Sequence, residues 1–292
     1  PGDYSQENYD RIDLHRPYVD NIVLVNAAGK PMYRETDLID VWFDSGSMPY
    51  AQLHYPFEGE MARGTEADRQ AMIHSDYEGT PIPPAYFPAD FINEGVDQTR
   101  GWFFTLHAIA TMIFDSVAFK NVISTGLVLD AKGNKMSKHV GNVTNPFEMM
   151  EKYGADPVRF YMMTNSEPWD NLKFDPEGVD EVRRKFFGTL YNTYSFLALY
   201  ANVDGFDPET MLNQGNLTER PEIDRWIISK ANSLIINVCK QLNDYDPTRA
   251  GRLIDNFVND DLSNWYVRLN RKRFWGKEMD SDKLNAYQTL YS

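Results

Sequence analysis

The pattern of apolar residues changes along the chain, and this change constrains the fold more than any other feature. Between residues 89 and 165, short apolar runs typical of strands alternate with longer runs of helical period. From about residue 176 onward, the period is helical throughout. The first part predicts an α/β sheet domain and the second an all-α helical bundle. A chain of 292 residues is long enough for both, with a boundary expected between 165 and 176.

Turn and capping residues divide the α/β part into elements. We expect a strand to end at 90–92, a helix to cover 101–114, and a buried strand to cover 122–129 before a tight turn at 130–134. The next helix is expected to start at Asn145-Pro146, because asparagine caps helices and proline fits the first helical position.

The helical part carries apolar side chains at the spacing of one helix face. Such stripes predict the core of a bundle rather than contacts to a cofactor. Their residues are Val182, Phe186, Leu190, Tyr194 and Leu197 in a first helix, and Ile223, Trp226, Ile227, Leu234, Val238 and Leu242 in a second. A third helix is expected to start at Asp246-Pro247 and to continue through Trp265 and Leu269.

The residues before the sheet domain form two segments of different character. Residues 1–36 predict short extended pieces, with a strand at 22–25 and a turn at 28–30. Residues 55–88 are charged and rich in proline, which is typical of a surface excursion. The chain does not begin with methionine and stops inside a helix-like segment, so we expect it to be an internal fragment of a longer protein.

Composition favours a cytoplasmic protein. No apolar run reaches the length of about 20 residues that a membrane-spanning helix needs, and the start lacks the basic and apolar regions of a signal peptide. The single cysteine, Cys239, is typical of a reducing compartment. Its apolar neighbours predict a buried, unreactive thiol rather than a nucleophile.

The net charge of −14 argues against contact with nucleic acid, but the cations are unevenly distributed. Residues 262–277 contain five cations and no carboxylate: Arg268, Arg271, Lys272, Arg273 and Lys277. From charge alone, a solvated helix face is the favoured interpretation, and contact with RNA phosphates is the alternative.

A lysine-rich tetrad, Lys135-Met136-Ser137-Lys138, directly follows the predicted turn. A loop between a strand and a capped helix could place both ammonium groups against the phosphates of a nucleotide, and such a loop can close on a substrate. An exposed hairpin tip, where lysines are common, is the alternative. Four residues alone do not decide between the two.

A second polar cluster, at 93–102, follows a short strand and leads into a helix. In α/β sheets such positions carry ligand-binding loops. Gly95 permits close approach of the backbone, and Glu94, Asp97 and Gln98 offer polar contacts suited to a ribose or an ammonium group. A capped helix N-terminus is the alternative.

A third segment, at 40–47, places Trp42 and Phe43 between two aspartates and before a Ser-Gly turn. Its two aromatic residues are expected in the core by default. This segment indicates no chemistry by itself.

Together these segments resemble one protein family. The tetrad at 135–138, followed by Gly141-Asn142-Val143, is similar to the signature lysine loop of the class I aminoacyl-tRNA synthetases. Residues 94–103 and 40–46 resemble the isoleucyl branch, whereas valyl and leucyl relatives carry different residues there. The helical part resembles the family's anticodon-binding domain at 224–227, 245–246 and 262–268.

The resemblance implies an order of domains. Residues 1–36 would form the returning stem of the editing insertion, and residues 37–170 the C-terminal half of a Rossmann-like nucleotide-binding catalytic domain. Residues 171–292 would form a truncated anticodon-binding helical domain. The family carries a His-x-Gly-His tetrad in the first half of its nucleotide-binding fold, and this chain contains none. We therefore expect the isolated chain to be inactive.

The resemblance also implies an activity in translation. Such a ligase activates isoleucine with ATP to isoleucyl-adenylate and then transfers the amino acid to tRNA(Ile). The implied partners are tRNA(Ile), isoleucine and ATP carrying Mg²⁺, with no protein metal site, no membrane and a monomeric parent protein. A non-catalytic RNA-binding module and a valyl or leucyl sister enzyme are the alternatives.

Roles for individual residues follow from the same resemblance. Lys135 and Lys138 would stabilise charge on the α-phosphate and the leaving pyrophosphate. Trp42 and Trp102 would line the isoleucine pocket. The ATP and adenylate contacts would come from Glu94, Gly95, Asp97, Gln98, Met136, Ser137 and Lys138. The tRNA contacts would come from Arg268, Arg271, Lys272 and Arg273. His139, where the family usually has serine, is expected to be an exposed loop residue.

Overall fold

The computed structural model describes residues 5–7, 11, 13, 15–37, 40–55, 86–212, 216–276 and 278–292. The chain divides into two compact units, which we describe separately. Unit 1 consists of Pro1–Phe87 and Gly101–Ala118, and unit 2 consists of Pro88–Arg100 and Phe119–Ser292. The surface excursion predicted at 55–88 falls almost wholly outside the described residues, as does Lys277 of the basic stretch.

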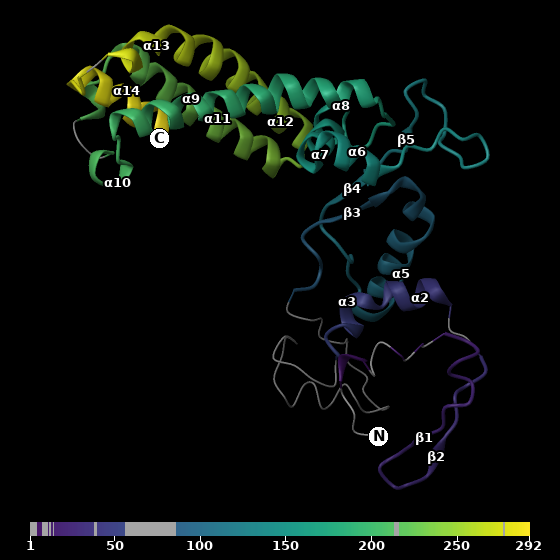
Figure 1. The fold of residues 1–292 in the computed structure, drawn as a ribbon. Coiled ribbons are helices and arrows are strands. Elements are labelled where there is room, and N and C mark those ends of the chain that lie inside the picture. Colours follow the sequence, from purple (N-terminus) through teal and green to yellow (C-terminus); the bar gives the residue numbers. More distant parts are fainter. Residues whose placement is uncertain are drawn as a thin grey trace. The chain divides into compact units, whose positions relative to one another are not determined.

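Unit 1 contains a short hairpin and helices (Figure 1). Strands β1 (Leu24–Val25) and β2 (Pro31–Met32) pair antiparallel, and the helices are α2 (Val41–Gly46), α3 (Met48–Ala51) and α5 (Trp102–Phe114). The hairpin turns through Gly29, whose φ of 75° suits a residue without Cβ. The predicted turn at 28–30 is confirmed, and the strand expected at 22–25 is confirmed only for its last two residues.

Helix α5 supplies most of the core of unit 1. Its buried face carries Phe103, Leu106, Ile109, Ala110 and Phe114. Aromatic rings of Tyr50, Phe87 and Phe114 pack together, with centroids 5.1 to 5.6 Å apart. These contacts confirm the apolar helix expected at 101–114, shifted by one residue at its start.

Unit 2 contains two pairs of parallel strands. Strand β3 (Ile92–Gly95) pairs with β4 (Val122–Thr125), and β5 (Val128–Leu129) pairs with β6 (Leu172–Lys173). The single strand expected at 122–129 is therefore broken at Gly126. There the backbone lies so close to Asp170 that a Cβ would stand 2.2 Å from its carbonyl oxygen.

The prediction that 122–129 is buried is wrong for much of its length. Val122, Leu127 and Val128 are 42%, 42% and 39% exposed. Parallel strands become buried when other elements cover them on both faces and both edges. Within the described part of the chain, β4 pairs with β3 alone, so it keeps an open edge.

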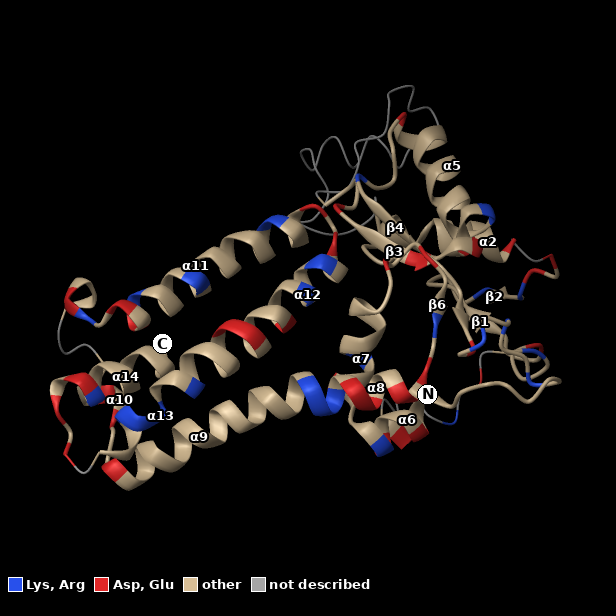
Figure 2. Cartoon of the chain, turned by 90° about the horizontal axis from the view of Figure 1, so that it is seen from above, with Lys and Arg blue, Asp and Glu red and all other residues tan. Residues whose placement is uncertain are grey.

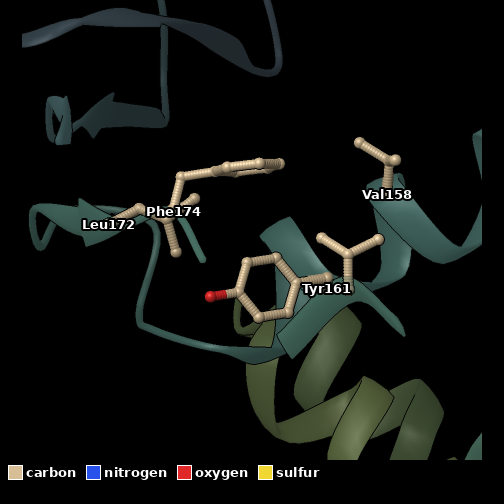
Figure 3. Packing of buried hydrophobic residues seen from close by; sticks show 5 residues of the cluster. Val158, Tyr161, Leu172 and Phe174 are labelled. Atoms are coloured by element: carbon tan, nitrogen blue, oxygen red, sulfur yellow. The ribbon is translucent and has the colours of Figure 1, made fainter. Parts of the chain in front are cut away.

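A hydrophobic cluster lies between β6 and three helices, α6 (Pro146–Tyr153), α7 (Ala155–Thr164) and α8 (Pro176–Val182). Figure 3 shows its centre, where the Tyr161 ring packs edge-on against Phe174 at 5.7 Å. The Tyr161 hydroxyl donates to the Lys173 carbonyl at 3.0 Å and accepts from the Asp175 amide at 3.2 Å. Every polar atom of this ring is thus satisfied inside the cluster. Strand β6 belongs to this packing although it lies beyond residue 170.

The rest of unit 2 is helical. Its elements are a π segment at Arg183–Phe187, α9 (Gly188–Asp204), α10 (Pro208–Met211), a 3₁₀ turn at Leu217–Glu219, α11 (Glu222–Asn243), α12 (Pro247–Asn256), a second π segment at Phe257–Val267, α13 (Arg268–Trp275) and α14 (Ser281–Tyr291). Helices α9, α11 and the continuous run from α12 to α13 lie side by side (Figures 1 and 2). This arrangement confirms the expected helical bundle.

The bundle is joined to α7 by polar contacts at the start of α12. Asp246 caps this helix, accepting from the Arg249 amide at 2.9 Å, as its Asp-Pro start predicted. The buried Thr248 hydroxyl donates to the Met163 carbonyl at 2.8 Å. The Arg252 guanidinium donates to the Thr164 carbonyl at 2.9 Å. These bonds satisfy carbonyls at the end of α7 that have no partner within that helix.

The first predicted stripe is only partly confirmed. Phe186 is buried and Leu197 packs against the core, but Leu190 and Tyr194 are 39% and 65% exposed. An α-helix turns by about 100° per residue, so the residue seven positions after Phe186 returns to its face, whereas Tyr194, eight positions after it, lies about 80° away around the helix. Thr193, one position before Tyr194, is buried instead.

The second stripe is likewise partial, and the prediction for Cys239 is wrong. Ile227 is buried, whereas Leu242 is 52% exposed. Cys239 is exposed, on a part of α11 where its apolar neighbours Ile235 and Ile236 are also exposed. Apolar neighbours in sequence do not bury a thiol when it lies on the exposed face of a long helix, and none of the described residues covers this face of α11.

Candidate functional site

The lysine tetrad lies on a loop that begins at the carboxyl end of β5. The Asp130 carboxylate accepts hydrogen bonds from the amides of Lys132 (3.0 Å) and Asn134 (2.7 Å). Gly133 adopts a φ of 87°, which favours glycine. Leu129 then bridges antiparallel to Lys135, so the tetrad starts on a short return strand. The tight turn predicted at 130–134 is confirmed.

Asn142 closes the loop from its far end. Its Nδ2 donates to Asp130 Oδ2 at 3.0 Å and to the Lys135 carbonyl at 3.2 Å, and its Oδ1 accepts from the Ser137 amide at 2.8 Å. The Asn142 amide and the Asn134 backbone donate to Asp130 and lower the pKa of that carboxyl to about 2. Asp130 is therefore a carboxylate at neutral pH.

The members of the tetrad point to different surroundings. Met136 packs against the Tyr161 cluster, whereas Lys135 and Lys138 are exposed and form no ion pair with any described residue. His139 is exposed, as expected, and its amide donates to Ser137 Oγ at 3.3 Å. The backbone is thus anchored while both ammonium groups face solvent.

The polar cluster at 93–102 begins inside a strand rather than after one. Strand β3 runs to Gly95, so Glu94 belongs to it, and its carbonyl accepts from Thr125 Oγ1 at 3.1 Å. A 3₁₀ turn at Val96–Arg100 follows, in which Gln98 Nε2 donates to Asp97 Oδ2 at 3.1 Å. The side chains of Glu94 and Asp97 are exposed. The prediction that a strand ends at 90–92 is therefore wrong, because β3 starts at Ile92 and ends at Gly95.

Both groups of residues lie at the carboxyl ends of parallel strands, in two separate two-stranded sheets. Residues 94–98 lie at or just after the carboxyl end of β3, and the lysine loop starts at the carboxyl end of β5. In open α/β sheets, ligands bind outside the carboxyl ends of the strands, so each of these two positions suits a ligand-binding loop.

Trp42 and Trp102 belong to unit 1. The Trp102 indole donates from Nε1 to the Ser45 carbonyl at 2.9 Å, which ties α5 to α2. Trp42 is 42% exposed and Phe43 is 48% exposed, so the expectation of core positions for this pair is wrong. Asp40 caps α2 by accepting from the Trp42 amide at 2.8 Å, so both rings belong to the first turn of this helix.

The basic stretch in the bundle divides into exposed and buried cations. Arg268, Arg271 and Lys272 are exposed and form no ion pair with a described residue. Arg273 is different, because its guanidinium forms a bidentate pair with the fully buried Asp224 at 2.6 and 2.8 Å. Figure 2 shows how carboxylates and cations are distributed along these helices.

Arg273 is also held by its own end of the bundle. It donates from Nε to Asp282 at 3.0 Å, and Tyr266 donates its hydroxyl to Asp224 at 2.8 Å. Burial opposes the charge of Arg273, but its hydrogen bonds to Asp224 prevail and raise its pKa. Burial raises the pKa of Tyr266. Because these partners occupy its guanidinium, Arg273 does not fit the role of an RNA phosphate contact.

Across the described ranges, no three His, Cys, Asp or Glu side chains gather in a way that could hold a metal ion. None of the helices in those ranges has the length and apolar character that a membrane crossing requires.

Sequence reasoning missed three residues of these sites. Asp130 and Asn142 were recognised only as turn or motif neighbours, and Asp224 only as part of a family segment. The spacing of Asp130 from Asn134 is a signal of an Asx-type turn and could have identified the carboxylate. No local signal links Asp224 to Arg273.

Two protein-family models match the chain. Residues 3–175 match the family model "tRNA synthetases class I (I, L, M and V)", and residues 224–292 match "Anticodon-binding domain of tRNA ligase". The two matches fall in the order that the resemblance implied.

Relatives named isoleucine–tRNA ligase match the whole chain. That of Bacteroides fragilis is 65% identical over 293 residues, which cover 100% of this chain and 24% of the relative. That of Porphyromonas gingivalis is 62% identical over 292 residues, with 100% and 24% covered. The resemblance to the isoleucyl branch is confirmed, and the chain spans about a quarter of the length of these relatives.

Solved structures share the fold at lower identity. The Agrobacterium radiobacter K84 agnB2 LeuRS–tRNA–LeuAMS ternary complex superposes with a TM-score of 0.59 and 19% identity, over 92% of this chain and 30% of that one. The Mycobacterium tuberculosis methionyl-tRNA synthetase in complex with methionyl-adenylate gives 0.57 and 22%, over 77% and 43%. The chain therefore belongs to the class I tRNA synthetases of the isoleucine, leucine, methionine and valine group, with an anticodon-binding domain after its synthetase region.

Proposed function

We propose that this chain is part of an enzyme that activates isoleucine with ATP to isoleucyl-adenylate and transfers it to tRNA(Ile). The observation that carries the proposal is identity of 62% to 65% to isoleucine–tRNA ligases over the whole chain. The activity belongs to the full-length protein, since the chain spans about a quarter of such relatives. We expect no activity from the isolated chain, which lacks a His-x-Gly-His tetrad.

Lys135 and Lys138 would stabilise the negative charge that develops on the α-phosphate and the leaving pyrophosphate. The substrate carboxylate is itself the nucleophile, so the protein has to position the reactants and stabilise charge. Exposed ammonium groups on an anchored backbone suit this task, because their cations are not neutralised by carboxylates of the described residues. Met136 and Ser137 would contribute contacts to the nucleotide from the same loop.

Glu94, Gly95, Asp97 and Gln98 would hold the aminoacyl-adenylate. Their position at the end of β3 supports this role, and the lack of a Cβ at Gly95 makes room for the Asp97 carboxylate, since a Cβ there would stand 2.6 Å from Asp97 Oδ1. Trp42 and Trp102 would line the isoleucine pocket. Mg²⁺ would arrive as part of the ATP substrate, coordinated by its phosphates.

Arg268, Arg271 and Lys272 would contact tRNA(Ile) phosphates through the anticodon-binding region. Their exposure supports this role, and we leave Arg273 out of the surface. We also propose three domains: a returning stem of the editing insertion at 1–36, the C-terminal half of the catalytic domain at 37–170, and the anticodon-binding domain at 171–292. The full-length protein would be a monomer in the cytoplasm.

The test is ATP–pyrophosphate exchange by the full-length protein with each of the twenty amino acids. Exchange that requires isoleucine and collapses in Lys138→Ala would support both substrate and lysine loop. Exchange driven by valine or leucine would keep the reaction class and overturn the specificity. No exchange with any amino acid would reject the ligase and favour a non-catalytic RNA-binding module.

A further inference from the structure

We infer that Asp130 and Asn142 are positioning residues, which together hold the backbone of the tetrad so that Lys135 and Lys138 face the nucleotide. This inference rests on the proposed function of the two lysines. It adds a mechanical role for two residues that would themselves touch neither substrate.

The geometry of Asn142 carries the argument. One side-chain amide uses its donor on Asp130 and on the Lys135 carbonyl, and its acceptor on the Ser137 amide, at 3.0, 3.2 and 2.8 Å. It thereby bonds to the first residue of the turn, to the first residue of the tetrad and to the third. Asparagine offers two N–H donors and a carbonyl acceptor on one planar amide, and glutamine, which has the same group, is longer by one methylene.

Asp130 forms the other half of this closure. Its two carboxylate oxygens accept from two backbone amides and from the side chains of Asn134 and Asn142, at 2.7 to 3.2 Å. Hydrogen bonds to an ionised acceptor are stronger than neutral ones. The carboxylate therefore fixes the near side of the loop while Asn142 bridges to the far side.

The lysines themselves have no comparable restraint. Both are exposed and unpaired with carboxylates of the described residues, so only the backbone determines where their ammonium groups can reach. Met136, between them, is packed against the Tyr161 cluster and blocks rotation of the tetrad as a whole. When the functional side chains are free to move, other contacts must hold the backbone that carries them.

The test uses the full-length protein with Asn142→Ala, Asn142→Asp and Asp130→Asn. The controls are Glu151→Gln and Asn202→Ala, which change the same chemical groups at exposed helical positions outside the loop. Two quantities are measured: kcat/KM for ATP in isoleucine-dependent pyrophosphate exchange, and the rate at which trypsin cleaves after Lys135 or Lys138 in the folded protein. Thermal unfolding verifies that each variant is folded.

We expect Asn142→Ala to lower kcat/KM for ATP and to raise the rate of tryptic cleavage at the tetrad, each by about tenfold. An effect of this size corresponds to the modest net contribution of a hydrogen bond. The KM for isoleucine should stay unchanged. Asn142→Asp should be worse at pH 8, because it sets a carboxylate against Asp130. Its exchange activity should recover relative to the unmodified protein towards pH 5.5, since neighbouring carboxylates share a proton there.

Unchanged tryptic cleavage in Asn142→Ala and Asp130→Asn would overturn the inference, whatever the exchange activity. Faster cleavage with undiminished exchange would overturn it too, because the closure would then be irrelevant to the lysines. If the unmodified protein shows no exchange with any amino acid, the proposed function fails. Cleavage after Lys135 or Lys138 would still decide whether Asn142 and Asp130 close the loop.

Discussion

Two basic segments of this chain use their cations in opposite ways. In the loop at 130–142, the backbone is held by Asp130 and Asn142 while Lys135 and Lys138 stay exposed. At the end of the 268–273 stretch, the Arg273 side chain is only 13% exposed and is paired with two aspartates. The number of cations per segment therefore says little about ligand binding. What matters is whether the fold brings a carboxylate to each cation.

The physical basis of the difference is desolvation. A buried guanidinium is tolerated only when carboxylates and hydrogen-bond acceptors replace its water, and Arg273 has Asp224, Asp282 and Asn270 for this. A lysine at the end of an anchored loop keeps its water until a phosphate displaces it. The first arrangement supports specificity of the fold, and the second supports binding.

The largest effect on stability is expected when the buried pair of Asp224 and Arg273 is disrupted. Asp224→Ala should destabilise the protein by about 3–5 kcal/mol, because it leaves Arg273 buried without its main partner and removes the acceptor of the Tyr266 hydroxyl. Denaturant unfolding measures the change. Arg271 is exposed and lies on the same helix as Arg273. Arg271→Ala should therefore change stability by at most about 0.5 kcal/mol. Equal losses of stability in Asp224→Ala and Arg271→Ala would show that the buried pair of Arg273 does not stabilise the fold more than an exposed cation does.

At the loop, the expected effect is on activity and not on stability. Lys138→Ala should reduce isoleucine-dependent exchange by about 100- to 1,000-fold, or about 2.7–4 kcal/mol of transition-state stabilisation. Its unfolding midpoint should match that of the unmodified protein, because the side chain is exposed. A drop in stability comparable to that of Asp224→Ala would contradict the separation of the two segments.

Gly126→Ala tests the backbone on which the loop is built. A methyl group there would stand 2.2 Å from the Asp170 carbonyl oxygen, so β5 and the segment before β6 must move apart. We expect a loss of about 1–3 kcal/mol in unfolding free energy. Gly141→Ala is a useful control, since its φ of 71° gives strain although no atom lies within 4 Å of the added carbon. A neutral Gly126→Ala would disprove the close approach.

The exposed cations of the bundle should show a smaller effect, in tRNA binding. Removing Arg271 should lower affinity for tRNA(Ile) by less than about tenfold and reduce the slope of log affinity against log salt by about one. Gel-shift or fluorescence titrations of the full-length protein at several salt concentrations measure both. Lys272→Ala should behave alike, whereas an unchanged salt slope in both variants would remove them from the RNA surface.

The smallest expected effect is on the pH dependence of the loop. The Asp130 pKa is lowered to about 2, so its stabilising contribution is fully present above the ordinary aspartate pKa of about 4 and is lost as the pH falls toward 2. The difference in unfolding midpoint between the unmodified protein and Asp130→Asn should therefore shrink from pH 6 to pH 3. A constant difference would mean that the carboxylate charge plays no part.

Much of the local structure could be predicted because local residues determine it. Asn145 caps α6 through the Phe147 amide at 3.0 Å, and Asp246 caps α12 in the same way. Both were expected from an Asx-Pro pair, whose side chain and fixed φ act within one turn of helix. The lysine loop was expected from the turn before it for the same reason.

The errors concern burial and register, which depend on distant partners. Thr193 and not Tyr194 faces the bundle, in which α9 packs against the π segment at Phe257–Val267. Cys239 is exposed because no described residue covers its face of α11, and the strand expected at 122–129 is interrupted where Gly126 meets Asp170. None of these partners lies within a few residues of the position that it affects.

The amino-acid sequence alone determined the family, the order of an α/β region and a helical bundle, and the tetrad with its two lysines. These depend on residue identity and on spacing within single elements. Tertiary structure alone decided which cations are available. Asp224 precedes Arg273 by 49 positions, and only the packing of α11 against α13 and α14 brings them to 2.6 Å. Pairing and burial are properties of the assembled helices, because desolvation depends on every neighbour in space and not on neighbours in sequence.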